Sequence, residues 1–233
     1  MSEKIHINDQ FNGCDFPLNF KYDIKNNVWV HLIENNFVEI GLLPITQFIM
    51  GKIVSIKSKP KGCNIYQNEP LLSVESKKFL GYVYSPLTGT IVEVNQKIVE
   101  MPWIVQTTNY ENSWIIKMSL SKPEEILLLN NSTDAIKYYK DLIKMKSIVC
   151  FKTPPDFVYP VIGIECSQVI MILSDIVSQL PLGATIHIVA DYNPGSEKDL
   201  LEWERITGNK VLEVYIEKVT TKGIIHGLIQ RIH

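Results

Sequence analysis

Short apolar runs separated by turn residues dominate the stretch from Tyr22 to about residue 120. Most of the runs are rich in β-branched and aromatic residues, and asparagine, proline or glycine stands between them. The clearest runs are Trp29-Val30-His31-Leu32, Phe37-Val38-Glu39-Ile40, Lys52-Ile53-Val54-Ser55-Ile56 and Thr90-Ile91-Val92-Glu93-Val94. This pattern predicts a domain made of short antiparallel strands.

Two of these strands resemble each other. Residues 51–56 and 89–94 both begin at a glycine and alternate apolar residues in the same register. Such an internal echo predicts two similar halves that close into a flattened β-sandwich, with both inner faces supplying one core.

Between the two echo strands lies a hairpin with adjacent lysines at its tip. The apolar runs 71–74 and 81–84 flank the segment Glu75-Ser76-Lys77-Lys78. An exposed turn is a suitable place for a lysine that is modified and must reach several partners. The alternative is an ordinary solvated turn lysine. The strand pattern alone does not distinguish Lys77 from Lys78.

Helical patterns border the strands. Residues 42–50 form a short apolar segment that predicts a helical turn over one end of the sandwich. Pro123 and two following acidic residues predict a helix start within 122–127. A second amphipathic helix is predicted over 132–143, capped by Ser132 or Thr133 and closing the first domain.

The remaining pattern divides the chain. Residues 1–20 predict a loosely ordered N-terminal arm, 21–145 the first domain, 146–157 a linker containing Thr153-Pro154-Pro155-Asp156, and 158–233 a second domain. Strands and helices alternate in the second domain. They are predicted as strand 158–164, helix 167–179, strand 184–190, helix 196–206, strand 211–216 and strand 223–232. This order predicts a two-layer α/β domain with both helices on one face of a four-stranded sheet.

Length, charge and apolar content narrow the class of protein. A chain of 233 residues with a formal net charge of -2 accommodates two domains but offers no concentrated basic face for nucleic acid. No apolar run approaches membrane-spanning length, and the N-terminus has no signal-peptide core, so no membrane role and a cytoplasmic location are expected.

Cysteine and histidine spacing indicates no metal site. Cys14, Cys63, Cys150 and Cys166 are widely separated, which predicts four free thiols without a zinc site or redox pair. The five histidines are isolated in sequence, which gives little support to a metal site or a Cys-His catalytic pair.

From about residue 16 to residue 143 the chain resembles the H protein of the glycine cleavage system and related lipoate-binding carriers. The resemblance rests on Glu75-Ser76-Lys77-Lys78 followed by Pro86-Leu87-Thr88-Gly89, with Trp29 and the stretch 109–114 also matching in place. Its spacing selects Lys78 for covalent lipoate, with Glu75 and Ser76 as the flanking motif. It implies a barrel-sandwich hybrid fold and a lipoate ligase or lipoyl transferase as partner. Biotin is disfavoured because the lysine lacks flanking methionines.

Residues 158–232 resemble the TusA-type sulfur carriers, which share the predicted βαβαββ order. The matching segments are 163–166, 180–183, 189–191, 194–195 and 207–209. The resemblance implies a persulfide on Cys166 at the start of a helix, where the helix dipole stabilises a thiolate. The two prolines that follow this cysteine in the family are absent, so a relict thiol in a docking domain is the alternative.

Together the two resemblances imply a carrier protein that acts as a substrate of other enzymes and is not itself a catalyst. The fused second domain favours sulfur-linked traffic between sulfur-transfer or oxidation enzymes. The first alternative is an aminomethyl carrier serving the glycine cleavage enzymes. The second is an adaptor with two degenerate sites that only binds partners.

Overall fold

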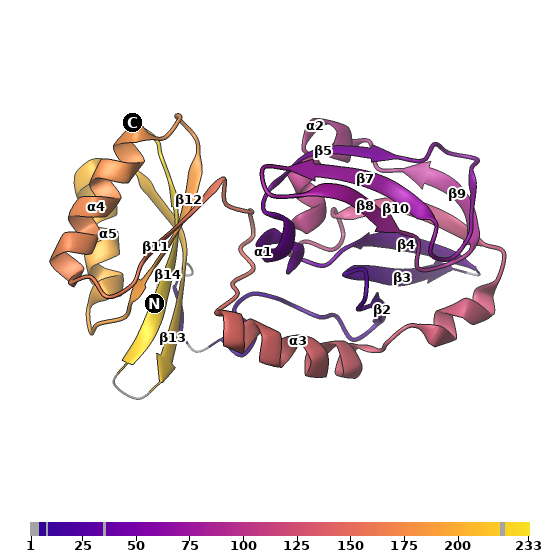
Figure 1. Ribbon diagram of the computed structural model, residues 1–233, viewed down its shortest axis with the longest axis horizontal. Coiled ribbons are helices and arrows are strands. Elements are labelled where there is room, and N and C mark those ends of the chain that lie inside the picture. The colour runs from indigo at the N-terminus through magenta and orange to yellow at the C-terminus, as the bar shows by residue number, and fades with distance from the viewer. Residues whose placement is uncertain (1–4, 8, 35, 220–221) are drawn as a thin grey trace. The chain divides into compact units, whose positions relative to one another are not determined.

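The computed structural model describes residues 5–7, 9–34, 36–219 and 222–233, apart from the side chains at 99, 166, 167, 218, 219 and 222. Main-chain contacts divide the chain into two units (Figure 1). One unit is Gly13–Pro154, and the other combines the described residues up to Asn12 with Pro155–His233.

The first unit contains two sheets. The larger has the order β2-β3-β4-β10-β9-β6, and the smaller has the order β5-β7-β8. The larger sheet consists of β2 (Phe20–Asp23), β3 (Val28–Glu34), β4 (Phe37–Leu42), β10 (Trp114–Leu120), β9 (Gly89–Val94) and β6 (Asn64–Ile65). The smaller consists of β5 (Ile53–Ser58), β7 (Pro70–Ser76) and β8 (Leu80–Tyr84). All neighbouring pairs are antiparallel.

Side chains from both sheets form one core. Val74 and Val83 from the smaller sheet and Ile91 and Ile116 from the larger sheet are all buried in the same cluster. The two echo strands, β5 and β9, lie in different sheets, as expected if each opens one half of a sandwich. The flattened β-sandwich predicted for this region is confirmed.

The helices of the first unit are mostly short. They are α1 (Thr46–Met50), α2 (Lys97–Glu100), the 3-10 helices η1 (Pro102–Gln106) and η2 (Pro123–Leu128), and α3 (Ser132–Lys146). The predicted cap of the last helix was wrong, since Asn131 accepts the N–H of Asp134 at 2.9 Å. In the described part of the chain, no helix has both the length and the apolar character needed to cross a membrane.

The prediction of four free thiols was wrong. Cys14 and Cys150 form a disulfide across 136 residues, with their Cα atoms 4.9 Å apart. Next to Cys150, the side chains of Ile148, Val149 and Phe151 are buried. Their apolar side chains explain why much of the predicted linker packs with the first unit.

The second unit is an α/β layer pair. Its elements are β11 (Phe157–Val161), α4 (Cys166–Gln179), β12 (Thr185–Asp191), α5 (Ser196–Thr207), β13 (Lys210–Val219), β14 (Lys222–Gln230) and β1 (Ile5–Ile7). Both helices cover the same face of the sheet, as predicted (Figure 1). The sheet order is β1-β13-β14-β12-β11, so it has five strands instead of the predicted four.

The extra strand comes from the segment predicted as a loose arm. Residues Ile5–Ile7 pair in parallel with Val214–Ile216 on β13. Three residues are too few to show the alternating pattern of a strand in the sequence. They form a strand because the edge of β13 offers main-chain groups for hydrogen bonding.

Candidate functional site

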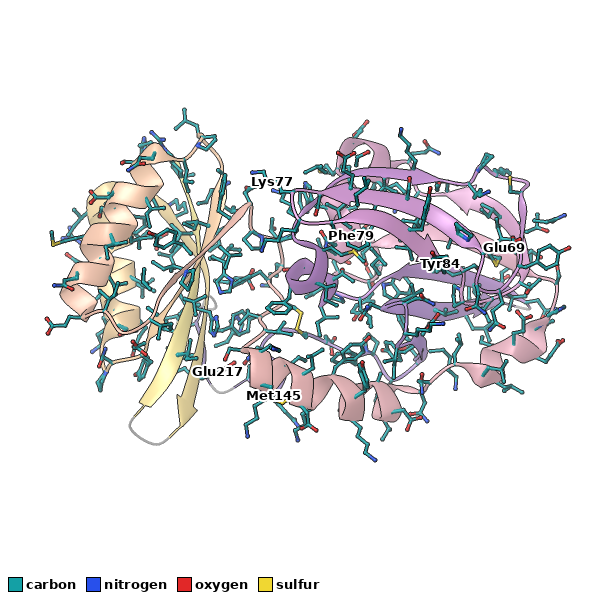
Figure 2. The ribbon with its side chains drawn as sticks, viewed as in Figure 1. Glu69, Lys77, Phe79, Tyr84, Met145 and Glu217 are labelled. Atoms are coloured by element: carbon teal, nitrogen blue, oxygen red, sulfur yellow. A yellow bond between two sulfur atoms is a disulfide. The ribbon has the colours of Figure 1, made fainter. Side chains whose placement is uncertain are left out.

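The predicted hairpin is present, with its lysines at the tip. β7 ends at Ser76 and β8 begins at Leu80, so Lys77, Lys78 and Phe79 form the turn between two antiparallel strands. Lys77 and Lys78 are both exposed, whereas Phe79 is partly buried against the core. Lys77 and Phe79, the first and last residues of the turn, are labelled in Figure 2. The turn therefore presents lysine while an aromatic ring anchors it.

The hydroxyl of Ser76 organises this turn. Its Oγ accepts hydrogen bonds from the main-chain N–H groups of Lys78 and Phe79, each at 3.0 Å, and donates to the carbonyl of Met50. The N–H of Ser76 in turn donates to the carbonyl of Phe79 at 2.8 Å. One donor and two acceptor positions saturate the hydroxyl. A serine two positions before the lysine thus fixes the lysine main chain and joins it to the end of α1.

The side chain of Lys78 runs alongside Gly51. A Cβ atom placed on Gly51 would lie 3.3 Å from Cδ of Lys78 and 3.6 Å from its Cγ. Gly51 ends α1 with φ of 69°, a conformation that favours glycine. The stem of Lys78 is supported by this backbone, and its amine remains in solvent. This packing involves Lys78, the lysine that the family spacing selects in sequence.

Glu75 lies beside the turn without joining it. Its side chain is exposed, and its main chain pairs with Leu80. On the same outer face of β8, Leu80, Tyr82 and Tyr84 are exposed, while Val83 between them is buried. An exposed apolar strip therefore begins at the C-terminal end of the lysine turn.

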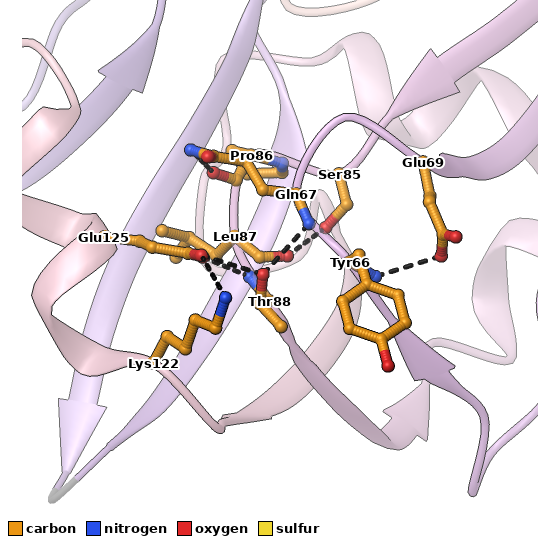
Figure 3. Close-up of polar contacts among 9 residues, drawn as sticks. All are labelled: Tyr66, Gln67, Glu69, Ser85, Pro86, Leu87, Thr88, Lys122 and Glu125. Carbon is orange, nitrogen blue, oxygen red and sulfur yellow. Dashed lines mark hydrogen bonds and ion pairs between the residues drawn. The ribbon is translucent and has the colours of Figure 1, made fainter.

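The segment after β8 is held by a carboxylate (Figure 3). Glu125 accepts the N–H of Thr88 at 2.7 Å and its hydroxyl at 2.9 Å. Gln67 donates its N–H to the Thr88 hydroxyl and its side-chain amide to the carbonyl of Pro86, both at 3.0 Å. Lys122 lies 3.9 Å from Glu125. These contacts fix the crossing from the smaller sheet to the larger one.

Gly89 completes the crossing because no larger residue fits there. A Cβ atom would lie 2.3 Å from the carbonyl oxygen of Ser119 and 2.7 Å from Cγ of Met118. β9 and β10 therefore approach too closely for a side chain at this point. The Pro86 to Gly89 motif is explained by backbone geometry at the opposite end of β8 from the lysines.

Two buried glutamines beside the turn were missed by the sequence analysis. Gln47 bonds to the main chain of Gln106 and Phe151, and Gln106 bonds to the main chain of Gly51 and Ile53. For Gln47 the available signal was an amide side chain within the largely apolar run 42–50, because a buried amide must find partners.

The predicted second site is described only by its backbone. Cys166 is the first residue of α4, after Glu165 at the N-cap position, and its side chain lies outside the described residues. The persulfide role of Cys166 stays a prediction. Cys63 has a free thiol and packs partly buried against the core of the first unit.

Two histidines predicted to be isolated lie together. Nε2 of His187 is 3.0 Å from Nδ1 of His226, which joins β12 to β14. Burial lowers the pKa of His226 to about 4. Across residues 5–7, 9–34, 36–219 and 222–233, no group of three or more histidine, cysteine or acidic side chains is arranged to hold a metal ion.

The two sheets and their exposed lysine hairpin have the architecture of an H-protein-like β-sandwich. The family model for the glycine cleavage H-protein matches residues 20–142. This match covers more than half of the chain, and the chain belongs to that family.

Individual proteins named as glycine cleavage system H proteins are also similar to this chain. The chain is 35% identical over 140 residues to "Probable glycine cleavage system H protein 2" of Saccharolobus solfataricus, covering 59% of this chain and 95% of that protein. It is 32% identical over 151 residues to "Glycine cleavage system H protein 2" of Aquifex aeolicus, covering 64% and 92%. The crystal structure of a glycine cleavage system H protein from Mycobacterium marinum aligns with a TM-score of 0.47 at 21% identity, covering 52% and 97%.

Proposed function

We propose that this protein is a lipoyl carrier whose lipoate is joined by an amide bond to Nζ of Lys78. Members of the glycine cleavage H-protein family carry covalently attached lipoate, and the family match supports the same cofactor here. The observation that carries the proposal is the turn itself. Ser76 fixes the main chain of Lys78, Gly51 supports its stem, and the amine stays exposed. A lysine held this way serves as the base of a mobile arm while the protein supplies recognition.

The group on the arm is proposed to be aminomethyl, as in a glycine cleavage H protein. The named relatives support this reading better than the sulfur-linked traffic favoured by the sequence analysis. Its partners would be a lipoate ligase or lipoyl transferase and the glycine cleavage enzymes. The protein would be their substrate and would catalyse no step itself.

Reconstitution tests this function. The lipoylated protein, mixed with glycine decarboxylase, is expected to support exchange between glycine and carbon dioxide. The Lys78→Arg variant is expected to support none, whereas Lys77→Arg retains the exchange. Exchange that survives in Lys78→Arg, or that is absent with fully lipoylated protein, contradicts the proposal.

Sulfur-linked traffic remains a second candidate because of the second unit. Its strand and helix order is that of the resemblance to TusA-type carriers, with Cys166 first in α4. The family match ends at residue 142 and gives this reading no support. Alkylation kinetics test it, since a persulfide carrier needs a thiolate at neutral pH. Cys166 reacting no faster than free cysteine would argue against sulfur handling.

A further inference from the structure

The Cys14–Cys150 disulfide joins the two ends of the first unit. That unit begins at Gly13 and ends at Pro154, so each cysteine lies close to one of its ends. Both side chains are only 1% exposed. The disulfide therefore joins the two ends of the domain, and we call it the clasp. It holds in place the segment next to Cys150, which we call the clasp segment.

The residue after Cys150 is bound by one side chain at both of its main-chain groups. Gln47 Nε2 donates to the carbonyl of Phe151 at 2.7 Å, and Gln47 Oε1 accepts the N–H of Phe151 at 3.2 Å. Gln47 lies in α1 and is buried. Its amide would lose both of its hydrogen bonds to Phe151 if the segment next to Cys150 moved, and buried amide groups left without a partner are costly.

Gln106 links Gln47 to the main chain at Gly51 and Ile53. Its main-chain carbonyl accepts a second hydrogen bond from Gln47 Nε2 at 2.8 Å. Its own amide accepts the N–H of Ile53 at 2.9 Å and donates to the carbonyl of Gly51 at 3.0 Å. The two glutamines therefore join the clasp segment to the end of α1.

The end of α1 is also the support of the lysine turn. Met50 accepts the hydroxyl of Ser76, and Gly51 lies under the stem of Lys78. A continuous path of covalent neighbours, hydrogen bonds and side-chain packing thus runs from Cys150 through Gln47 to Lys78. Such contiguous networks transmit a change when one end has two discrete states.

We infer that the Cys14–Cys150 disulfide is a redox clasp that sets the presentation of Lys78, with Gln47 and Gln106 as positioning residues. When it is oxidised, the clasp holds Phe151 against Gln47 and the turn is fixed. When it is reduced, the segment around Phe151 is released and the turn loosens. The part of this inference that concerns the lipoyl arm rests on the proposed function.

The opening reaction is thiol–disulfide exchange with an external dithiol. Because both cysteines are buried, the segment around one of them must first open locally. A thiolate of the dithiol then attacks one sulfur of the pair, and the other cysteine leaves as a thiolate that takes up a proton. The second thiol of the reductant then displaces the first cysteine. The products are two protein thiols and one oxidised dithiol. In the cytoplasm predicted for this chain, disulfides are usually transient or redox-sensing, which fits a reversible clasp.

Amide hydrogen exchange on the full chain tests the clasp without requiring lipoate. Oxidised protein is compared with dithiol-treated protein and with the Cys14→Ser/Cys150→Ser variant. Protection at the amides of Lys78, Phe79 and Ile53 is expected to fall about ten-fold in the reduced protein. The amide of Thr88, held by Glu125 at the other end of β8, serves as the internal control and keeps its protection. Dithiol treatment supplies the comparison even if the double variant does not fold.

Two matched variants, Gln47→Glu and Gln67→Glu, distinguish a specific effect on the lysine turn from a general loss of stability. Gln47→Glu keeps the disulfide and the acceptor oxygen but removes both donated bonds, and it is expected to reproduce the loss of protection at Lys78 and Phe79. Gln67→Glu also removes a donated bond, to Pro86 at the far end of the strand, and is expected to leave these two amides unchanged. Equal loss at Thr88, or unchanged Lys78 and Phe79 amides after reduction, overturns the clasp.

Lipoylation kinetics then extend the test to the arm. A lipoate ligase is expected to modify oxidised and reduced protein with different kcat/KM, and Gln47→Glu is expected to match the reduced protein. Equal kcat/KM in both states overturns the effect on the arm. Protein that accepts lipoate in neither state contradicts the proposed function. In that case hydrogen exchange still shows whether reduction of the disulfide loosens the lysine turn.

Discussion

The Ser76 hydroxyl oxygen lies 3.0 Å from the main-chain nitrogen of Lys78 and accepts its hydrogen bond. Because the same oxygen also binds the N–H of Phe79 and the carbonyl of Met50, one small side chain fixes the whole lysine turn. The serine of the Glu-Ser-x-Lys spacing is therefore a structural requirement of the turn, separate from any contact with the attached group.

Ser76→Ala is expected to loosen the turn. The variant leaves two main-chain donors and one carbonyl without their partner, which predicts a loss of about 1–2 kcal/mol in the free energy of unfolding. Lipoylation by a ligase is expected to slow, since the main chain of Lys78 is no longer fixed. Urea unfolding and ligase kinetics measure the two effects. Ser73→Ala, earlier on β7, is the control, and an equal effect from both variants would show that Ser76 has no special role.

The lysine turn was predictable because its determinants are local. Apolar runs around a charged segment predict a hairpin, and the spacing between Ser76, Lys78 and Pro86 is read directly from the sequence. Gly89 was part of the same motif, although its reason, the approach of Ser119, is visible only in the fold.

The contacts that join distant segments were not predictable. Cys14 and Cys150 are 136 residues apart, and spacing alone carries no information about their proximity. The strand Ile5–Ile7 exists only because the edge of β13 is available to it. Such a disulfide or edge strand forms only when the fold brings a distant partner close, and the local sequence does not encode that partner. His187 and His226 meet for the same reason, through strand pairing across 39 residues.

Glu125→Gln is expected to weaken the crossing between the sheets. The carboxylate accepts both the N–H and the hydroxyl of Thr88, and an amide offers only one acceptor oxygen. Loss of one hydrogen bond to a charged group predicts a decrease of roughly 1.5–3 kcal/mol in the free energy of unfolding. Chemical denaturation measures it, and the exposed neighbour Glu124→Gln should change little. A Glu125→Gln variant as stable as the parent would show that this carboxylate does not stabilise the segment between β8 and β9.

The stability of the second unit is expected to fall in mild acid. Burial lowers the pKa of His226 to about 4 from its ordinary value of 6.5, so the unfolded chain binds a proton between these values that the folded chain does not. Stability is therefore fully present above pH 6.5 and declines as the pH falls towards 4, by about 3 kcal/mol at most.

The pH dependence of unfolding for His226→Gln tests this assignment. The variant is expected to show a flatter decline between pH 6.5 and pH 4 than the parent protein. His233→Gln, at the exposed C-terminus, is expected to keep the parent's slope. Identical slopes for the parent and His226→Gln would assign the acid sensitivity to other groups.

Intact mass and a peptide map of the protein expressed with a lipoate ligase test the lipoylation of Lys78 most directly. We expect a single lipoyl addition, mapped to Lys78 and retained in Lys77→Arg, but lost in Lys78→Arg. An unmodified protein, or a lipoyl group mapped to Lys77, would contradict Lys78 as the site of lipoate attachment.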